Sequence, residues 1–529
     1  MRIKFISPCA YFNVRKSLLP IGMARLAGFL KTKGHEVEQD DLLIKVRRRL
    51  ESDPSAPEKI NIMQFYDFKK VRDYLFRDDP EPEIEQTLDE ILSMTSVEGY
   101  DLLCFSVVSA HQNPFALMLA KKIKKTLNIP IVFGGPFITL RMHLYLKWFP
   151  FIDYLIIGHG EQPLLKLLEH LEGKEKIENV PNLLYLKQGD VIRNRFQTQP
   201  MECTCLPDFE GLPIDLYWEK VSGDMQLVMP YDISKGCIFS CSFCKHNLME
   251  SFEQKSIKKA VDEIEALSKK YGAKCFHFTD SGINFDLKYL DSLMDAFISR
   301  QLGIRWGVFA VPNNLNKEML LKMRKAGCEY LAYGIETGSE KVLKAMEKPF
   351  TLKAARRILK DTKEAGIKNI AHILVGHPHE TEEDFRQTLD FLRENEELIF
   401  GIFPIKFFLE NESPIHLNPE KHKIEVFLRE SFLPLISNMH GGTHAFEEVG
   451  GMTWGERELV VKERWERLLR FIYEVDRKRS PEFKNISYDA IRKLTRKYFS
   501  DKEKGKFLYH KLEWSLERIK RLAIVDRFT

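Results

Sequence analysis

The sequence lacks the features that mark membrane, secreted and nucleic-acid-binding proteins. None of its apolar runs approaches the roughly 18 residues that a membrane-spanning helix needs. The amino terminus, MRIKFISPCA, has no signal-peptide cleavage pattern and is expected to form a first strand. Lys and Arg total 80 against 76 Asp and Glu in 529 residues. This nearly neutral balance gives no reason to expect nucleic-acid binding. We therefore expect a soluble cytoplasmic protein.

Cysteine is scarce as well, because nine cysteines in so long a chain cannot form a disulfide scaffold. Their distribution is uneven, however. Cys237, Cys241 and Cys244 all fall within one short stretch. In a reducing compartment such clustering indicates metal or redox chemistry.

The first 190 residues alternate between apolar strands and amphipathic helices. A polar, mostly helical insertion at 44–98 interrupts this alternation. The pattern predicts a domain over 1–190 with a Rossmann-like, doubly wound parallel α/β sheet. The expected strands are 3–7, 102–108, 130–135 and 153–158, and the expected helices are 22–34, 115–127 and 162–171.

The rest of the chain divides into three parts. Residues 191–225 lose periodicity and predict an interdomain linker. A second strand–helix series over 226–412 predicts a partial (β/α)6 barrel of the TIM type. Residues 413–529 are expected to be helix-rich, with the strongest amphipathic helix at 457–479. The expected barrel strands are 227–234, 274–280, 304–311, 330–336, 369–376 and 400–408.

The cysteines Cys237, Cys241 and Cys244 form a C-x3-C-x2-C set directly after an apolar strand. Three thiolates from one short loop can hold three irons of a cubane cluster. The fourth iron would keep an open coordination position, where a substrate can bind. The alternatives are a zinc site with a distant fourth ligand, or chance clustering.

This cysteine motif resembles the signature of radical S-adenosylmethionine (SAM) enzymes, with Phe243 directly before the last cysteine. The sequence departs from the family pattern at Lys235 and His379, where arginine and glycine are usual. The first domain resembles the cobalamin-binding domain that precedes the barrel in one branch of this superfamily. Further matching segments are 278–281, 333–339 and 372–381 in the barrel, and 19–22, 106–109, 134–136 and 158–161 in the first domain.

The resemblance implies a mechanism and a set of site residues. Cys237, Cys241 and Cys244 would ligate a [4Fe-4S] cluster whose unique iron is chelated by SAM. Electron transfer from the cluster would cleave SAM to a 5′-deoxyadenosyl radical, which abstracts hydrogen from an unactivated carbon. The residues implied to lie near SAM are Phe243, Asp280, Ser281, Glu336 and Gly376.

Cobalamin would bind the first domain without a histidine ligand, because the chain has no Asp-x-His-x-x-Gly motif. The phosphate-bearing tail of the corrin would run along strand ends and glycine loops. The alternative is a domain that keeps the fold but no longer binds the cofactor. The residues implied to approach cobalamin are Ser106, Ser109, Gly134, Gly135, Gly158 and Gly160.

Two histidine pairs admit both a functional and a plain interpretation. His377 and His379 flank Pro378 at the expected barrel mouth, where they would transfer protons, position substrate or simply form loop surface. His440 and His444 enclose a Gly-Gly pair that favours a turn.

The leading functional hypothesis is a cobalamin-dependent radical SAM enzyme that methylates an unactivated carbon. One rival is a family member that cyclises, couples or rearranges its substrate without methylation. The other is a non-catalytic sensor of cobalamin or SAM, which would not need an open iron. The expected partners are a small-molecule, lipid or peptide substrate and an external electron donor of the flavodoxin or ferredoxin type.

Overall fold

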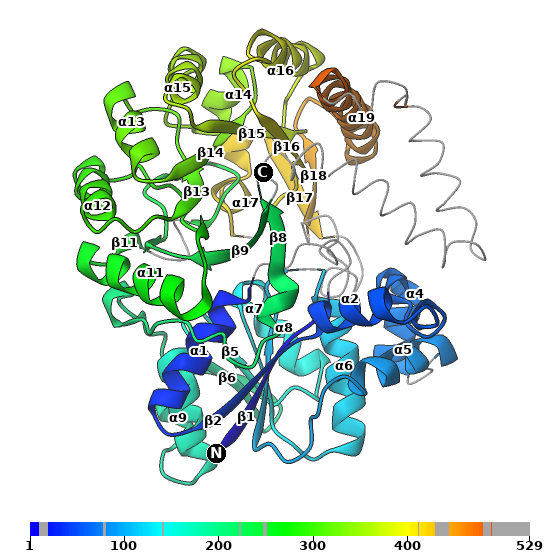
Figure 1. Ribbon diagram of the computed structural model, residues 1–529. Coiled ribbons are helices and arrows are strands. Elements are labelled where there is room, and N and C mark those ends of the chain that lie inside the picture. The colour runs from blue at the N-terminus through cyan, green and yellow to red at the C-terminus, as the bar shows by residue number, and fades with distance from the viewer. Residues whose placement is uncertain are drawn as a thin grey trace. The chain divides into compact units, whose positions relative to one another are not determined.

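The computed structural model describes two compact units, one built from residues 1–217 and the other from the described residues from 218 onward (Figure 1). None of the helices in the described part of the chain is long and apolar enough to cross a membrane. The described residues are 1–9, 19–77, 81–109, 111–139, 142–221, 224–246, 251–410, 412–428, 444–479 and 488.

The first unit is built on a seven-stranded sheet with the order β2-β1-β3-β4-β5-β6-β7. The five strands β1 to β5 are parallel to one another, whereas β6 and β7 add an antiparallel hairpin at the edge. The doubly wound parallel fold is confirmed. Its strands are β1 (Arg2–Ser7), β2 (Glu36–Asp41), β3 (Leu102–Ser106), β4 (Ile131–Gly134), β5 (Tyr154–Ile156), β6 (Leu183–Lys187) and β7 (Asp190–Arg193).

Helices pack on the sheet of the first unit, and apolar residues fill the space between them. Residues 44–98 are mostly helical, and their core side chains join the main core, as the contact between Phe65 and Phe115 illustrates. The helices are α1 (Ile21–Thr32), α2 (Leu42–Ser52), α3 (Ala56–Lys59), α4 (Phe68–Arg72), α5 (Pro82–Leu92), α6 (Asn113–Thr126), α7 (Pro136–Thr139), α8 (Met142–Trp148) and α9 (Glu161–Leu171).

The structure departs from the linker expected at 191–225. Residues up to 217 pack as part of the first unit, and the second unit begins at 218. Polar contacts fasten this aperiodic segment. Lys31 binds Asp208 at 2.8 Å, and the hydroxyl of Tyr217 donates to Asp41 at 2.8 Å. Its stability comes from side-chain partners far away in the sequence, which its own periodicity cannot reveal.

The second unit contains a curled sheet with the order β16-β15-β14-β13-β12-β9-β8, in which only β8 is antiparallel. The six parallel strands coincide with the six expected ones, so the partial barrel is confirmed. Its strands are β8 (Trp218–Val221), β9 (Asp224–Tyr231), β12 (Cys275–Phe278), β13 (Arg305–Ala310), β14 (Cys328–Glu336), β15 (Lys368–Val375) and β16 (Gly401–Lys406).

Helices follow the outside of this half barrel (Figure 1). Each begins with a local signal, such as the Ser256 cap of α11 or the capping box between Thr381 and Asp384 in α16. The helices are α11 (Ile257–Tyr271), α12 (Leu287–Ser299), α13 (Lys317–Lys325), α14 (Glu340–Ala345), α15 (Leu352–Glu364) and α16 (Glu382–Glu394).

After the barrel come the short helix α17 (Pro414–Leu417), the antiparallel strands β17 (Ile424–Leu428) and β18 (His444–Glu448), and the long helix α19 (Trp454–Arg479). Helix α19 agrees with the amphipathic helix expected at 457–479. His440 and nearly all of residues 480–529 lie outside the described residues, and His444 opens β18.

Candidate functional site

The three clustered cysteines lie on one loop that follows β9 and the short strand β10 (Ser234–Lys235). Cys237, Cys241 and Cys244 are half-buried free thiols. Cys237 raises the pKa of Cys241, and both of these thiols raise the pKa of Cys244, so the three lie near one another. The sequence motif therefore becomes one group of thiols at the carboxyl end of the first barrel strand.

The loop is anchored before its first cysteine by a buried carboxylate. Asp280, at the end of β12, accepts hydrogen bonds from the backbone nitrogen and the hydroxyl of Ser234, both at 2.5 Å. Its second oxygen accepts from the backbone nitrogen of Ile233 at 3.2 Å. Burial raises the pKa of Asp280 to about 6, although these hydrogen bonds oppose the shift.

A second anchor lies between the last two cysteines. The fully buried Ser242 donates its backbone N–H to Met346 and its hydroxyl to Ala345, both at 3.0 Å. Directly after the motif, Lys245 forms a buried ion pair with Glu410 at 2.5 Å. The loop is thus held before, within and after the cysteines.

A buried lysine lies next to the thiols. The ammonium of Lys348 is 5.4 Å from the ring centroid of Phe243 and 2.9 Å from a carboxylate oxygen of Glu336. Burial works to lower the pKa of Lys348, but Glu336 and the thiols Cys241 and Cys244 outweigh it and raise the pKa. Lys348 therefore supplies a permanent positive charge at the site.

The thiol chemistry fits an iron–sulfur cluster. Burial raises the pKa of all three thiols, that of Cys244 to about 11, while Lys348 works against the shift. They must release protons to become ligands, and the nearby ammonium stabilises the resulting negative charge. In the described part of the chain, no three His, Cys, Asp or Glu side chains surround a single ion position, and this holds for the three cysteines too, so the fit rests on the chemistry of the thiols.

Glu336 is held in an unusual conformation at the end of β14. It adopts a left-handed φ of 64°, and the register of the sheet shifts between Gly334 and Glu336. A Cβ on Gly334 would lie 2.6 Å from the Glu336 carboxylate and 3.1 Å from the Lys348 ammonium. Gly334 therefore makes room for this ion pair. Glu336, which is expected to lie near SAM, already binds Lys348 through one of its carboxylate oxygens.

The other residues expected near SAM occupy neighbouring strand ends. Ser281 directly follows Asp280 and is half-buried, while Phe243 packs against a cluster that includes Leu374 and Phe407. Gly376 follows β15 with a φ of 90°. Both carboxylate oxygens of Asp280 bind donors of the cysteine loop. Its expected contact with the SAM amino group stays a prediction.

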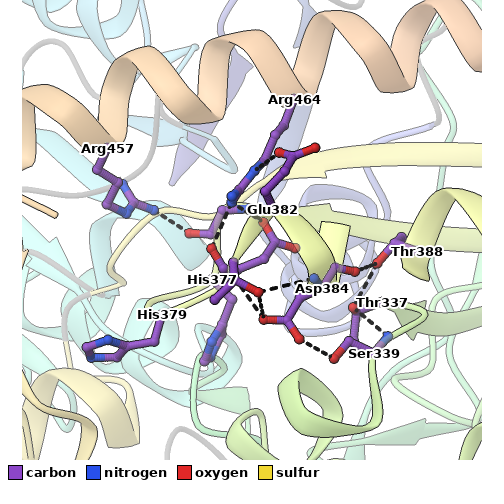
Figure 2. A network of polar contacts seen from close by, with 12 residues as sticks. Thr337, Ser339, His377, His379, Glu382, Asp384, Thr388, Arg457 and Arg464 are labelled. Carbon is purple, nitrogen blue, oxygen red and sulfur yellow. Dashed lines mark hydrogen bonds and ion pairs between the residues drawn. The ribbon is translucent and has the colours of Figure 1, made fainter. Parts of the chain in front are cut away.

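The turn after Gly376 holds two histidines in different settings (Figure 2). His377 is buried, burial lowers its pKa to about 3, and its Nε2 has no hydrogen-bond partner in the described structure. His379 adopts a left-handed φ of 60°, which explains why glycine is usual at this position. Its backbone nitrogen donates to Glu448 at 2.8 Å.

A polar network joins this turn to the end of β14 (Figure 2). Asp384 accepts from the hydroxyl of Ser339 at 2.7 Å, and Lys341 binds it at the same distance. Burial opposes ionisation of Asp384, but these partners and Thr381 lower its pKa to about 2. Thr388 also accepts from the backbone nitrogen of Gly338 at 3.0 Å. The segment that follows β14 is therefore fixed to the first turns of α16.

The concave face of the sheet carries aromatic and histidine side chains that the sequence analysis did not single out. Tyr333 contacts Thr362 of α15 on the outer face, so alternate residues of β14 such as Tyr330 face inward. The Tyr330 hydroxyl lies 2.5 Å from His277 Nδ1. His372 contacts the rings of Phe309 and Phe403, each at a centroid distance of 4.9 Å. Their alternation along the strands was the signal available in the sequence.

The residues expected to approach cobalamin lie at the carboxyl edge of the first sheet. Ser106 ends β3 and Gly134 ends β4, and a Cβ on Gly134 would meet only ordinary contacts. At Gly135 a Cβ would lie 2.6 Å from the carbonyl oxygen of Val107, so the protein itself excludes a side chain there. At Gly158 and Gly160 a Cβ would lie 3.1 Å from Phe196 and 3.0 Å from Leu26, which are tight contacts that a small shift of those side chains can relieve.

Gln112 braces the loops at the point where the sheet order reverses. Strand β1 lies between β2 and β3, so the ends of β1 and β3 form the crevice in which doubly wound sheets bind ligands. Gln112 accepts from the backbone nitrogens of Val108 at 2.7 Å and Ser109 at 3.3 Å, and donates to the carbonyl of Pro8 at 3.0 Å. Gln112 thus fixes the described loop residues Pro8, Val108 and Ser109 to one another at this edge.

Two family matches cover much of the chain. Residues 231–392 match the radical SAM superfamily, and residues 71–168 match the B12 binding domain. Among curated relatives, an uncharacterized methyltransferase of Pyrococcus horikoshii is 27% identical over 283 residues, which is 52% of this chain and 60% of that protein. The anaerobic magnesium-protoporphyrin IX monomethyl ester cyclase of Rubrivivax gelatinosus is 28% identical over 290 residues, 53% of this chain and 51% of the cyclase. The chain therefore spans only part of the length of these relatives.

Solved structures share the fold. The radical SAM methyltransferase TsrM of Kitasatospora setae, with cobalamin and a [4Fe-4S] cluster bound, has a TM-score of 0.61 at 16% identity. That match covers 81% of each chain. The cobalamin-dependent SAM radical enzyme OxsB has a TM-score of 0.58 at 17% identity, over 80% of this chain and 56% of OxsB.

Proposed function

We propose that this chain, which carries a B12-binding domain followed by a radical SAM domain, transfers a methyl group to an unactivated carbon. Its cofactors are cobalamin, a [4Fe-4S] cluster and SAM. When bound, the cluster supplies one electron for the reductive cleavage of SAM, and cobalamin supplies a carrier for the methyl group. The enzyme depends on an external one-electron donor of the flavodoxin or ferredoxin type.

The observation that carries the proposal is the anchored cysteine loop. Cys237, Cys241 and Cys244 would hold the cluster, and Asp280 and Ser242 anchor the loop that carries them. An anchored loop reduces the entropy that cluster binding would otherwise cost. Lys348, whose side chain is only 10% exposed, would offset the negative charge of the thiolates.

The chain's remaining site residues bind, orient and exclude water. Gly376 and the turn that follows it form one wall of the SAM site, and Glu336 another. The aromatic side chains Phe309 and Phe403 line the concave face, where a substrate carbon would be shielded from bulk solvent. We expect the substrate to be a small molecule, a lipid or a peptide.

The first experiment measures cofactors and product mass together. Protein purified without oxygen from cells supplied with hydroxocobalamin should contain near-stoichiometric corrin and iron. Cys241→Ala should abolish cleavage of SAM to 5′-deoxyadenosine, while the matched control Cys203→Ala, an exposed thiol of the first unit, should leave it intact. Unchanged cleavage in Cys241→Ala would defeat the cluster assignment.

A second candidate is ring formation without methylation. It is favoured by the 28% identity to the anaerobic cyclase of Rubrivivax gelatinosus. The mass of the product separates the two reactions, because methyl transfer adds one methylene unit and cyclisation removes two hydrogens. A cluster without corrin would instead mean that the first domain no longer serves a cobalamin reaction.

A further inference from the structure

Helix α19 is the last described element of the second unit, and it packs on β15, β16 and α16. Three of its residues, Arg457, Val461 and Arg464, recur at intervals of four and three. They therefore share one helical face. The side chains of both arginines are only 5% exposed. Arginine is seldom buried so deeply unless its hydrogen-bond partners are specific.

Arg457 binds the backbone of the turn that follows β15. Its guanidinium donates to the carbonyl oxygen of Gly376 and lies 4.2 Å from the ring centroid of Phe446. Its nearest carboxylate, that of Glu458, is 3.8 Å away and exposed. Burial lowers the pKa of Arg457 to about 10, so the side chain stays charged at neutral pH. A buried cation thus uses a neutral peptide carbonyl as its main partner (Figure 2).

Arg464 holds the other side of the same turn. It donates to the carbonyl of Glu380 at 2.9 Å and to the Glu380 carboxylate at 3.2 Å. The same carboxylate oxygen accepts the backbone N–H of Gly376 at 2.9 Å. The two arginines therefore fix the carbonyl of Gly376 directly and its N–H through Glu380.

Val461 lies between the arginines and explains the glycine itself. A Cβ on Gly376 would lie 2.5 Å from a methyl carbon of Val461, closer than real Cβ contacts allow. The family resemblance places Gly376 near SAM. The structure shows a protein reason for the missing side chain, since α19 occupies that space.

We propose that α19 is the element that positions the SAM-binding turn, with Arg457, Val461 and Arg464 as its positioning residues. The inference rests on the proposed function in one respect, namely that residues 376–380 face SAM. It gives the segment after the barrel a defined task. None of the three residues needs to touch SAM, because each acts through Gly376 or Glu380.

The test compares SAM binding in full-length, reconstituted protein. Arg457→Met and Arg464→Met should each raise the Kd for SAM by roughly tenfold or more, because each removes a charge-assisted hydrogen bond to the turn. Binding is read from the change that SAM produces in the electron paramagnetic resonance spectrum of the reduced cluster. Amide hydrogen exchange of residues 374–382 should rise in the same variants.

Arg467→Met is the matched control, because Arg467 lies on the same helix and pairs with Glu382 without contacting Gly376 or Glu380. It should bind SAM like the wild type. Arg464→Lys should recover part of the lost affinity, since lysine can still donate to Glu380. If a methionine variant fails to fold, Arg457→Lys and Val461→Ala carry the same comparison with smaller changes.

A double-mutant cycle isolates the contact between the helix and the glycine. Gly376→Ala is strained by its φ of 90° in any background, so that strain cancels in the cycle. Val461→Ala should therefore restore part of the SAM affinity lost in Gly376→Ala.

The outcomes separate this inference from the proposed function. If the arginine variants keep normal iron content, SAM affinity and exchange rates, α19 does not position the turn and the inference is overturned. An absence of rescue by Val461→Ala overturns the role of that residue. If the wild-type protein itself neither binds nor cleaves SAM, the proposed function fails before the variants are compared.

Discussion

Asp280 accepts two hydrogen bonds of 2.5 Å from Ser234, three residues before the first cysteine of the motif. This contact joins the end of β12 to the start of the cysteine loop. A carboxylate whose two oxygens both bind backbone or hydroxyl donors is a structural brace. Its first task is therefore to shape the loop, whatever contact it makes with SAM.

Asp280→Ala should accordingly reduce iron content before it affects SAM binding. The variant leaves two buried N–H donors without an acceptor, at a cost of about 1–3 kcal/mol each. Iron and sulfide per protein after anaerobic reconstitution measure the effect. The neighbouring Ser281→Ala serves as the control and should keep its cluster. Full iron content with weakened SAM binding would instead return Asp280 to the role expected from the sequence.

Replacing Lys348 should destabilise the second unit strongly. Lys348→Met leaves the carboxylate of Glu336 buried without its partner, which typically costs roughly 3–5 kcal/mol. Lys344→Met, at an exposed position of α14, is the matched control. Denaturant unfolding under anaerobic conditions measures both. The double variant Lys348→Met/Glu336→Gln should regain most of the loss, and a failure to regain it would show that the ion pair is not the cause.

The pH dependence of stability should reveal Glu380. Burial raises its folded-state pKa to about 7 from an ordinary value of 4.5, with Arg464 and the Gly376 N–H opposing the shift. The folded protein therefore binds this proton more tightly than the unfolded chain does. Its contribution to stability is complete below pH 4.5 and is lost as the pH rises towards 7, by up to about 3 kcal/mol. Unfolding curves of Glu380→Gln should lack this decline. Identical pH profiles for variant and wild type would contradict the prediction.

Asp384 should show the opposite trend. Its folded-state pKa is lowered to about 2, so its contribution is present above the unfolded value near 3.8 and is lost as the pH falls towards 2. The effect of Asp384→Asn should consequently shrink below pH 3.8. Measurements of both variants across the same pH series separate the two carboxylates.

Gln112→Ala should weaken cobalamin retention while leaving the cluster intact. The substitution frees two backbone N–H groups and one carbonyl at the crevice between β1 and β3, so both loops lose their brace. We expect cobalamin affinity to fall on the order of tenfold, which corresponds to about one lost hydrogen bond. Corrin absorbance per protein gives the readout. Gln188→Ala, in the exposed hairpin turn between β6 and β7, is the control. Unchanged retention would place the corrin elsewhere.

Much of the fold was predictable because its strands are apolar. The six parallel barrel strands and the core strands β3 and β4 follow from short hydrophobic runs. Strand β2 reads Glu-Val-Glu-Gln-Asp-Asp and carries no such signal. Its buried Asp40 is stable because Lys4 pairs with it at 2.7 Å and Lys45 also binds it. Those lysines come from other elements, so the periodicity of residues 36–41 alone could not reveal that they form a strand.

The site divides in the same way. The spacing of Cys237, Cys241 and Cys244 was sufficient to bring out the thiol group, because all three come from one loop. The partners of Glu336 and Gly376 were not predictable. They are Lys348 and Val461, and the second lies 85 positions away in the sequence. Motifs reveal which residues matter, but long-range packing decides what each one contacts.

The dependence of the Gly376 turn on α19 also sets an order of events during synthesis. A ribosome makes β15 and its turn long before it reaches Arg457 and Arg464. Until those residues emerge, the carbonyl of Gly376 lacks its arginine donor, and the carboxylate of Glu380 keeps only the backbone N–H of Gly376. The nascent barrel can therefore complete its sheet before α19 is made, whereas the turn gains its contacts with Arg457 and Arg464 only afterwards.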